Sequence, residues 1–131
     1  MSLLNLEPLA ALAAKEMIDP TDAKTCENTI TKSLAVLTEQ GVYAFGLFLA
    51  TRKDKEKPAV DGIDRQLRYL LKETRLYESK DQDKASYYRG ISAVGADETA
   101  TDALRRLLLT KQLMEITLTY GRYHAKAMNH D

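Results

Sequence analysis

Four basic residues in the middle of the chain have a spacing that could bring their charges together. Arg65, Arg68, Lys72 and Arg75 stand at offsets of 0, 3, 7 and 10, so on a helix they share one face. Arginine and lysine arranged in this way neutralise the phosphates of a nucleic-acid backbone and release its counterions. Tyr69 borders the four and offers a ring on which a base can stack. The pattern predicts an RNA-binding basic stripe.

The same spacing also fits an ordinary solvated helix face. Charged runs usually face solvent, and Asp64 stands one turn before Arg68, where it can pair with it. The chain has 19 basic and 19 acidic residues, so its net charge of +0 does not by itself indicate a nucleic-acid partner. Both interpretations of the stripe stay open on sequence grounds.

Residues that could perform catalysis are not grouped in any known pattern. The two histidines, His124 and His130, are six apart and miss the i, i+4 spacing of a helical zinc pair. Glycine-rich phosphate loops and a G-x-S-x-G motif are absent from the sequence. The acidic pairs Asp81/Asp83 and Asp97/Glu98 stand in a polar segment, where helix capping explains them. We therefore expect no catalytic residues, no metal and no cofactor.

Helical spacing recurs along the chain, whereas strand alternation is nearly absent. A length of 131 residues, with 44% hydrophobic and 29% charged residues, is typical of one globular domain. The predicted helices cover residues 3–18, 20–40, 41–50, 61–77 and 99–127, and a short helix is possible at 84–91. These observations predict an all-α fold, a compact bundle of five to six helices in a single helical domain, residues 1–131.

Local signals mark the boundaries of these helices. Asp19 and Pro20 are typical of an N-cap followed by the first helical position, and Gly41 suits a helix end. The helix over 41–50 is apolar nearly all round, which predicts burial. A charged surface loop is expected over 52–58.

The last helix carries two apolar stripes on roughly opposite sides. The first stripe holds Leu109, Leu113, Ile116, Tyr120 and Ala127, and the second holds Leu104, Leu107, Met114 and Leu118. A helix with two apolar sides must be covered on both. We expect a central C-terminal helix, and the alternative is that one side docks a partner protein.

The cellular compartment follows from two features. Cys26 is the only cysteine, so no internal disulfide can form and a reducing compartment is indicated. The first residues lack the basic start of a secretion signal, and no apolar run approaches the ~20 residues that span a bilayer. The prediction is a cytoplasmic protein without membrane contact.

Two segments resemble a known family. They are SLAVLTEQGVYAFGLFLATRK, residues 33–53, and ALRRLLLTKQLMEITLTYGRYHAKA, residues 103–127. The first resembles the helix–glycine–helix signature of the small subunit (Cmr-type) of type III-B CRISPR RNA-targeting effector complexes. The second resembles the C-terminal helix of that family, which ends in an aromatic and basic run. The small subunit of the related type III-A complex is an alternative.

The resemblance implies a non-catalytic subunit in antiviral RNA silencing. It would line the path of guide RNA and single-stranded target RNA, and contact other effector-complex subunits and copies of itself, while other subunits cleave. The implied RNA-binding surface is the basic stripe of Arg65, Arg68, Lys72 and Arg75, with Arg52, Lys53, Tyr69, Arg105, Arg106, Lys111 and Arg122 as further possible contacts. The neutral charge of the chain implies weak RNA affinity for the free subunit.

Two other functions compete with this one. A helical protein-interaction adaptor without nucleic-acid contact would use the apolar sides of the last helix for a partner and the basic stripe for an acidic surface. A metal-free helical ribonuclease would depend on His124, and its activity would be lost in His124→Ala.

Overall fold

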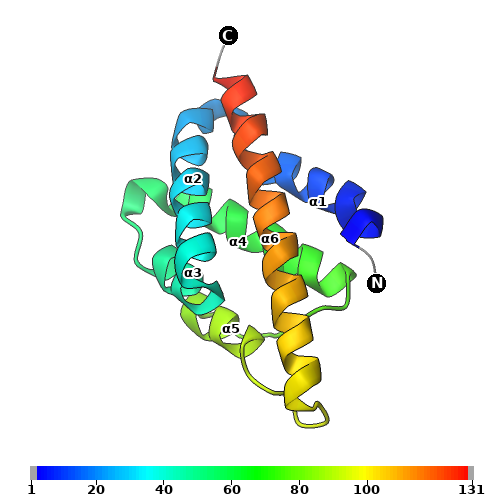
Figure 1. The fold of residues 1–131 in the computed structure, drawn as a ribbon. Coiled ribbons are helices and arrows are strands. Elements are labelled where there is room, and N and C mark those ends of the chain that lie inside the picture. The colour runs from blue at the N-terminus through cyan, green and yellow to red at the C-terminus, as the bar shows by residue number, and fades with distance from the viewer. Residues whose placement is uncertain (1–2, 130–131) are drawn as a thin grey trace.

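The computed structural model describes residues 3–129, and its regular elements are all helices (Figure 1). Its elements are α1 (Leu3–Glu16), the 3₁₀ turn η1 (Pro20–Asp22), α2 (Ala23–Gln40), α3 (Val42–Ala50), the 3₁₀ turn η2 (Asp54–Glu56), α4 (Lys57–Glu73), α5 (Lys84–Ile91) and α6 (Ala100–Met128). No strand occurs within this range. The predicted all-α bundle of five to six helices is confirmed, including the short helix at 84–91.

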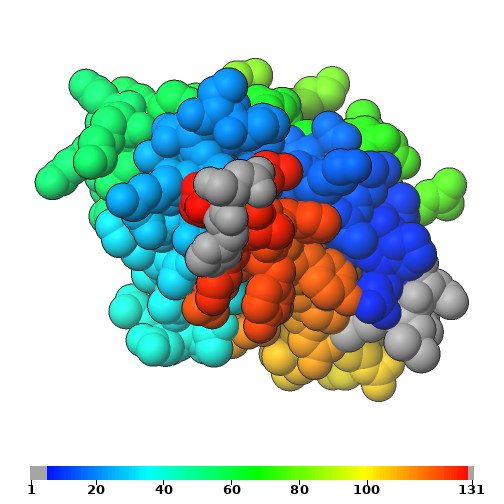
Figure 2. Space-filling view, turned by 90° about the horizontal axis from the view of Figure 1, so that it is seen from above, coloured from blue at the N-terminus to red at the C-terminus, as the bar shows by residue number. Residues whose placement is uncertain are grey.

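The long helix α6 runs along the molecule and packs against α1 and α2 (Figure 1). Figure 2 shows the C-terminal part of α6 lying between α2 and α1. Helix α3 packs against α5 and α2, and α4 packs against α1 and α2. The six helices share one hydrophobic core. None of them, over the residues described, is long and apolar enough to cross a membrane.

Short-range signals place most helix boundaries. The carboxylate of Asp19 accepts a hydrogen bond from the backbone N–H of Thr21 at 2.9 Å, and η1 begins at Pro20. Gly41 adopts a φ of 97°, in the region that favours glycine, and its N–H closes α2 on the carbonyl of Leu37 at 3.0 Å. The chain therefore turns from α2 into α3 at the predicted glycine.

The fourth helix is displaced toward the N-terminus relative to its prediction. It spans 57–73 rather than 61–77. Pro58, predicted to end a charged loop, lies in the first turn of α4. Backbone N–H groups in a first turn have no acceptor within the helix, so the N–H that proline lacks costs no hydrogen bond. The predicted loop over 52–58 is partly ordered as η2, and Glu56 in it is buried. These boundaries correct the prediction.

Helix α5 contributes two fully buried tyrosines to the core. The ring of Tyr88 meets Phe45 of α3 edge-on at 5.2 Å, and Tyr87 meets Tyr77 in the same way at 5.1 Å. Gly46 allows the approach of α3 to α5, because a Cβ at this position would lie 2.7 Å from the Cβ of Tyr88. The segment 78–97, polar in sequence, thus supplies large buried side chains.

Two expectations about burial are wrong in part. Helix α3 is not buried all round, since Tyr43 and Leu47 are exposed on its outer side while Val42, Phe45 and Leu49 are buried. On α6, Leu104 and Ala127 are exposed, although both belong to the predicted apolar stripes. The reason is geometric: each helix meets its neighbours on one side, and no element within residues 3–129 covers the other.

Candidate nucleic-acid interface

The exposed face of α4 carries part of the predicted basic stripe. Arg65, Tyr69 and Lys72 stand at offsets of 0, 4 and 7, which places them within about 60° of one another around the helix axis. All three are exposed. The two cationic side chains therefore flank an aromatic ring on a single surface.

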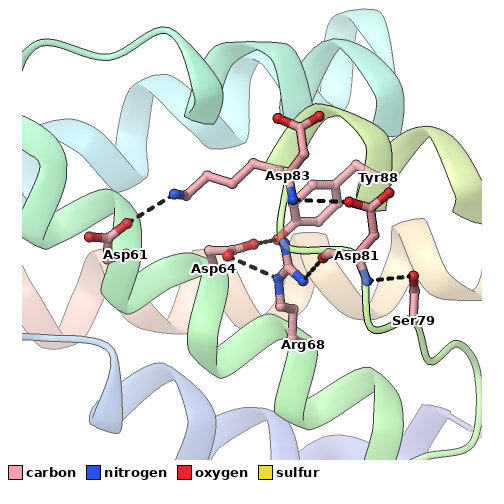
Figure 3. Close-up of polar contacts among 8 residues, drawn as sticks. Asp61, Asp64, Arg68, Ser79, Asp81, Asp83 and Tyr88 are labelled. Atoms are coloured by element: carbon pink, nitrogen blue, oxygen red, sulfur yellow. Dashed lines mark hydrogen bonds and ion pairs between the residues drawn. The ribbon is translucent and has the colours of Figure 1, made fainter.

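Arg68 belongs to the same stripe in sequence but turns toward α5. Its Nε donates to Oδ2 of Asp64 at 2.9 Å, and its Nη1 donates to the backbone carbonyl of Asp81. Its guanidinium carbon lies 4.1 Å above the centre of the Tyr87 ring. Figure 3 shows the guanidinium between the carboxylate of Asp64 and the segment at Asp81. The charge of Arg68 is thus used within the molecule, as the pairing with Asp64 considered from sequence implies.

Asp64 joins this network to α5. Its second oxygen, Oδ1, accepts a hydrogen bond from the buried hydroxyl of Tyr88 at 2.8 Å (Figure 3). Burial, followed by the nearby charge of Asp64, raises the pKa of Tyr88 well above its ordinary value. The phenol therefore stays protonated and remains a donor. A further link, from Lys84 to Asp61 at 3.0 Å, ties the start of α5 to α4.

Arg75 does not lie on the helix, which corrects the prediction of a four-residue face. Helix α4 ends at Glu73, and Arg75 adopts a φ of 60°. The N–H of Arg75 donates to the carbonyl of Lys72 at 3.0 Å, and the N–H of Leu76 donates to the carbonyl of Leu71 at 3.0 Å. These two bonds form a Schellman motif, in which glycine is the usual residue at this conformation. Arg75 is exposed just beyond the end of the helix.

A polar pocket of about 210 Å³ lies beside the exposed face of α4. It is lined by Arg68, Tyr69, Lys72, Glu78, Ser79 and Tyr87. Lys72 and Glu78 form a loose ion pair across it, with 3.7 Å between Nζ and Oε2. The hydroxyl of Tyr87 is buried without a hydrogen-bond partner in the described part of the chain. Sequence reasoning missed Glu78 and Ser79, because nothing in their local pattern relates them to α4.

The capping interpretation of the acidic pairs is correct for Asp83. Its carboxylate accepts a hydrogen bond from the backbone N–H of Ser86 at 2.9 Å at the start of α5. Hydrogen bonds from Ser86 lower the pKa of Asp83. The other acidic pair behaves differently, because Glu98 accepts hydrogen bonds from Arg106 and from the N–H of Gly95.

The basic residues predicted from the loop lie at the opposite end of α4. Arg52 donates to the carbonyl of Phe48 at 3.2 Å and its guanidinium stacks 4.0 Å from that ring, so it caps α3. Lys53 is exposed immediately before η2. At 1.5 Å per residue, the 15 residues from Lys57 to Lys72 extend about 22 Å, so the loop cations are remote from the pocket.

The four predicted residues on α6 have different environments. Arg105 and Arg122 are exposed and Lys111 is half-buried. Arg106 has an internal role: it donates to the carbonyls of Ile91 and Ala93 and to both oxygens of Glu98, at 2.8–3.1 Å. Its guanidinium therefore holds the turn between α5 and α6 and is not presented to solvent as a free charge.

His124 lines an open depression of about 390 Å³ between α1 and α6, together with Glu7 and Tyr120. The hydroxyl of Tyr120 donates to Oε1 of Glu7, and this hydrogen bond raises the pKa of Tyr120. His130 lies outside the described residues. Over residues 3–129, no group of three or more histidine, cysteine or acidic side chains is placed to hold a metal ion.

Comparison with known proteins adds no family: no protein-family model, curated protein or solved structure matches this chain.

Proposed function

We propose that this chain is a non-catalytic, RNA-contacting small subunit of a CRISPR effector complex of type III-B, with the type III-A small subunit as the nearest alternative. The proposal takes the family from the resemblance of residues 33–53 and 103–127. It takes the RNA contact from a single structural observation, the exposed alignment of Arg65, Tyr69 and Lys72 on α4. It extends to the predicted cytoplasmic location and to contacts with guide RNA, target RNA, other subunits and further copies of the chain.

The chemistry of this surface suits single-stranded RNA. Arg65 and Lys72 carry exposed charges for phosphates, and Tyr69 between them presents a ring for base stacking. Arg75 adds a third exposed cation just past the helix end. Arg68 supports the surface from beneath, since its guanidinium is paired with Asp64 and stacked on Tyr87. The expected RNA track is therefore Arg65, Tyr69, Lys72 and Arg75.

The affinity of the free subunit is expected to be weak. Three phosphate contacts on a single strand give a log-affinity against log-salt slope of roughly 2, at about 0.7 per contact. In an assembly, neighbouring copies would add their contacts, because linked sites bind far more tightly than isolated ones.

The test is fluorescence anisotropy of a labelled single-stranded RNA over a salt series. The variant changes Arg65, Lys72 and Arg75 to Ala and leaves Arg68 in place, because Arg68 is part of the internal network. The matched control changes Lys24, Lys32 and Lys126, three exposed lysines on α2 and α6. The expected result is a salt slope lower by roughly 2 in the variant and unchanged in the control. An equal decrease of the salt slope in both triple variants contradicts the proposal, and so does the absence of RNA binding by the wild type at low salt.

A protein-interaction adaptor is the second candidate, and exposed apolar side chains favour it. Leu9 and Leu12 on α1 lie along a narrow groove shared with Tyr69 of α4, and Leu104 and Leu108 are exposed on α6. If the chain is only an adaptor, changing Leu9 and Leu12 to Ser abolishes co-purification with the effector subunits. The triple alanine variant at Arg65, Lys72 and Arg75 then leaves RNA affinity unchanged.

A further inference from the structure

The pocket beside Lys72 has a buried floor and an exposed rim. Arg68 and Tyr87 form the floor: the first is 22% exposed at its side chain and the second is 1% exposed. Tyr69, Lys72 and Glu78 are exposed around it. The opening is thus on the same surface as the proposed RNA track, between the last turns of α4 and the segment that follows.

The rim offers a carboxylate that is available to a ligand. Within residues 3–129, Glu78 pairs only with Lys72, at 3.7 Å, and both side chains are 63% exposed. Exposed ion pairs of this length contribute little to stability, so either group can turn to a new partner. A free carboxylate accepts two parallel hydrogen bonds from a ligand that presents two adjacent donors.

Donors complete the polar lining. The hydroxyl of Ser79 accepts a hydrogen bond from the N–H of Asp81 at 3.1 Å, which leaves its own proton free to donate. The hydroxyl of Tyr87 is buried without a partner within residues 3–129. The ammonium of Lys72 supplies further donors at the rim. The pocket therefore combines an acidic acceptor with donors for an acceptor-bearing ligand.

The wall and the volume suit a flat ring of modest size. Tyr69 lines both this pocket and the groove against α1, so its ring stands between the two hollows. Stacking on such a ring binds any nucleobase. About 210 Å³ is below the roughly 300 Å³ at which pockets for drug-sized ligands begin, and so it suits one base rather than a whole nucleotide.

We propose that this pocket binds a single guanine base of single-stranded RNA, an inference that rests on the proposed function. Guanine is the base whose Watson–Crick edge places two donors, N1–H and the N2 amino group, side by side for a carboxylate such as Glu78. Its O6 and N7 are acceptors for the hydroxyls of Ser79 and Tyr87, which leaves Lys72 to the phosphate. Adenine and cytosine place a ring acceptor at the corresponding position, and uracil offers a single donor.

The experiment measures base preference rather than affinity alone. A nine-nucleotide oligouridine with one central position varied among guanine, adenine, cytosine and uracil is titrated by anisotropy at low salt. The wild type is expected to bind the guanine oligonucleotide about tenfold more tightly than the other three, from the ~1–3 kcal/mol of a bidentate base contact. GMP is expected to compete for the guanine oligonucleotide, and AMP is not.

Two variants and their controls isolate the pocket. Glu78→Gln removes one of the two carboxylate acceptors, so the ratio of guanine to adenine affinity should fall toward one. Overall affinity should hold or rise, because the substitution removes a negative charge. Tyr69→Ala should weaken the binding of all four oligonucleotides, because it removes the ring on which a base stacks. Tyr123→Ala, which removes another exposed tyrosine, and Glu39→Gln, which removes another exposed carboxylate, are expected to leave the ratio unchanged.

The outcomes separate this inference from the proposed function. Equal affinity for all four oligonucleotides, with a normal salt slope, overturns the guanine pocket and leaves the RNA-contacting role standing. If GMP binds but the protein shows no preference among the oligonucleotides, the pocket binds free nucleotides. This result also overturns the inference that the pocket binds a guanine base of RNA. No RNA binding at any salt concentration overturns the proposed function and the inference together.

Discussion

The hydroxyl of Tyr88 donates a hydrogen bond to Oδ1 of Asp64 across 2.8 Å, although 24 positions separate the two residues in the chain. The other oxygen of the same carboxylate accepts from Arg68 at 2.9 Å. One acidic side chain thereby joins α4 to α5 and fixes the direction of an arginine that the sequence assigned to the RNA-binding stripe. This carboxylate consequently shapes the floor of the pocket.

Replacing that carboxylate should destabilise the protein strongly. Asp64→Ala leaves the buried hydroxyl of Tyr88 without its acceptor and the guanidinium of Arg68 without its carboxylate partner. We expect a loss of about 3 kcal/mol in the free energy of unfolding. Urea unfolding followed by circular dichroism measures it. The control is Asp61→Ala, which breaks only the ion pair to Lys84 and should cost below ~1 kcal/mol. Equal losses in the two variants would show that the buried network adds no stability.

The contact between α3 and α5 leaves no room for a methyl group. In Gly46→Ala the new Cβ would lie 2.7 Å from the Cβ of Tyr88, which cannot move without moving the helix. We expect destabilisation of about 1–3 kcal/mol and a lower thermal midpoint. Gly95→Ala is the control, since its Cβ would meet nothing closer than 3.4 Å, and its thermal midpoint should change little. A midpoint for Gly46→Ala equal to that of the control contradicts the close packing.

Replacing Arg75, the left-handed residue just after α4, with glycine should stabilise the protein. Arg75 holds a φ of 60°, a conformation that costs an L-residue roughly 1 kcal/mol and costs glycine little. Part of the gain is offset by the greater freedom of glycine in the unfolded chain. Arg75→Gly should therefore raise the free energy of unfolding by about 0.5 kcal/mol.

A β-branched residue at the same position provides the opposite test. Arg75→Val should lower the free energy of unfolding, because valine tolerates this conformation poorly. Both substitutions remove the same charge, so any equal loss of RNA affinity in the two variants reports the phosphate contact rather than the backbone. Equal stability of the glycine and valine variants would contradict the Schellman geometry.

The ion pair between Glu98 and Arg106, which closes the turn between α5 and α6, should make the stability of the protein sensitive to acid. Hydrogen bonds from Arg106, together with the N–H of Gly95, lower the pKa of Glu98 from its ordinary value of 4.5. Glu98 binds its proton more weakly in the folded form than in the unfolded form. The stabilisation by this ion pair is therefore present above pH 4.5 and is lost as the pH falls through the lowered pKa of Glu98. Urea unfolding at pH 7 and over a series below pH 4.5 measures this loss.

Two variants check the assignment to Glu98. Glu98→Gln should be less stable than the wild type at pH 7 and should lose less of its stability on acidification. Asp97→Asn, at an exposed neighbouring carboxylate, should follow the wild-type profile. A Gln variant with the full acid dependence of the wild type would assign that dependence to other carboxylates.

Much of the fold was determined by short-range sequence signals. The caps at Asp19 and Asp83 and the joint at Gly41 act through hydrogen bonds and backbone angles within a few residues, so the sequence placed those helix boundaries closely. The 3.6-residue period likewise predicted the extent of α6, and the sequence allowed a short helix at 84–91, where α5 lies. The sequence does not predict the start of α4, because Pro58 fits the end of a loop as well as the first turn of a helix.

Only the tertiary structure decided which charges face solvent. Arg65, Arg68 and Lys72 share one face in sequence, and the sequence left open whether Arg68 pairs with Asp64 or faces a ligand. In the structure Arg68 is paired with Asp64 and stacked on Tyr87 of α5. Leu104 fits a buried stripe, yet no element in the described chain covers it. Helix formation depends on neighbours within about four residues. Burial and pairing depend on which distant segment packs against which side, and this cannot be derived from the local pattern.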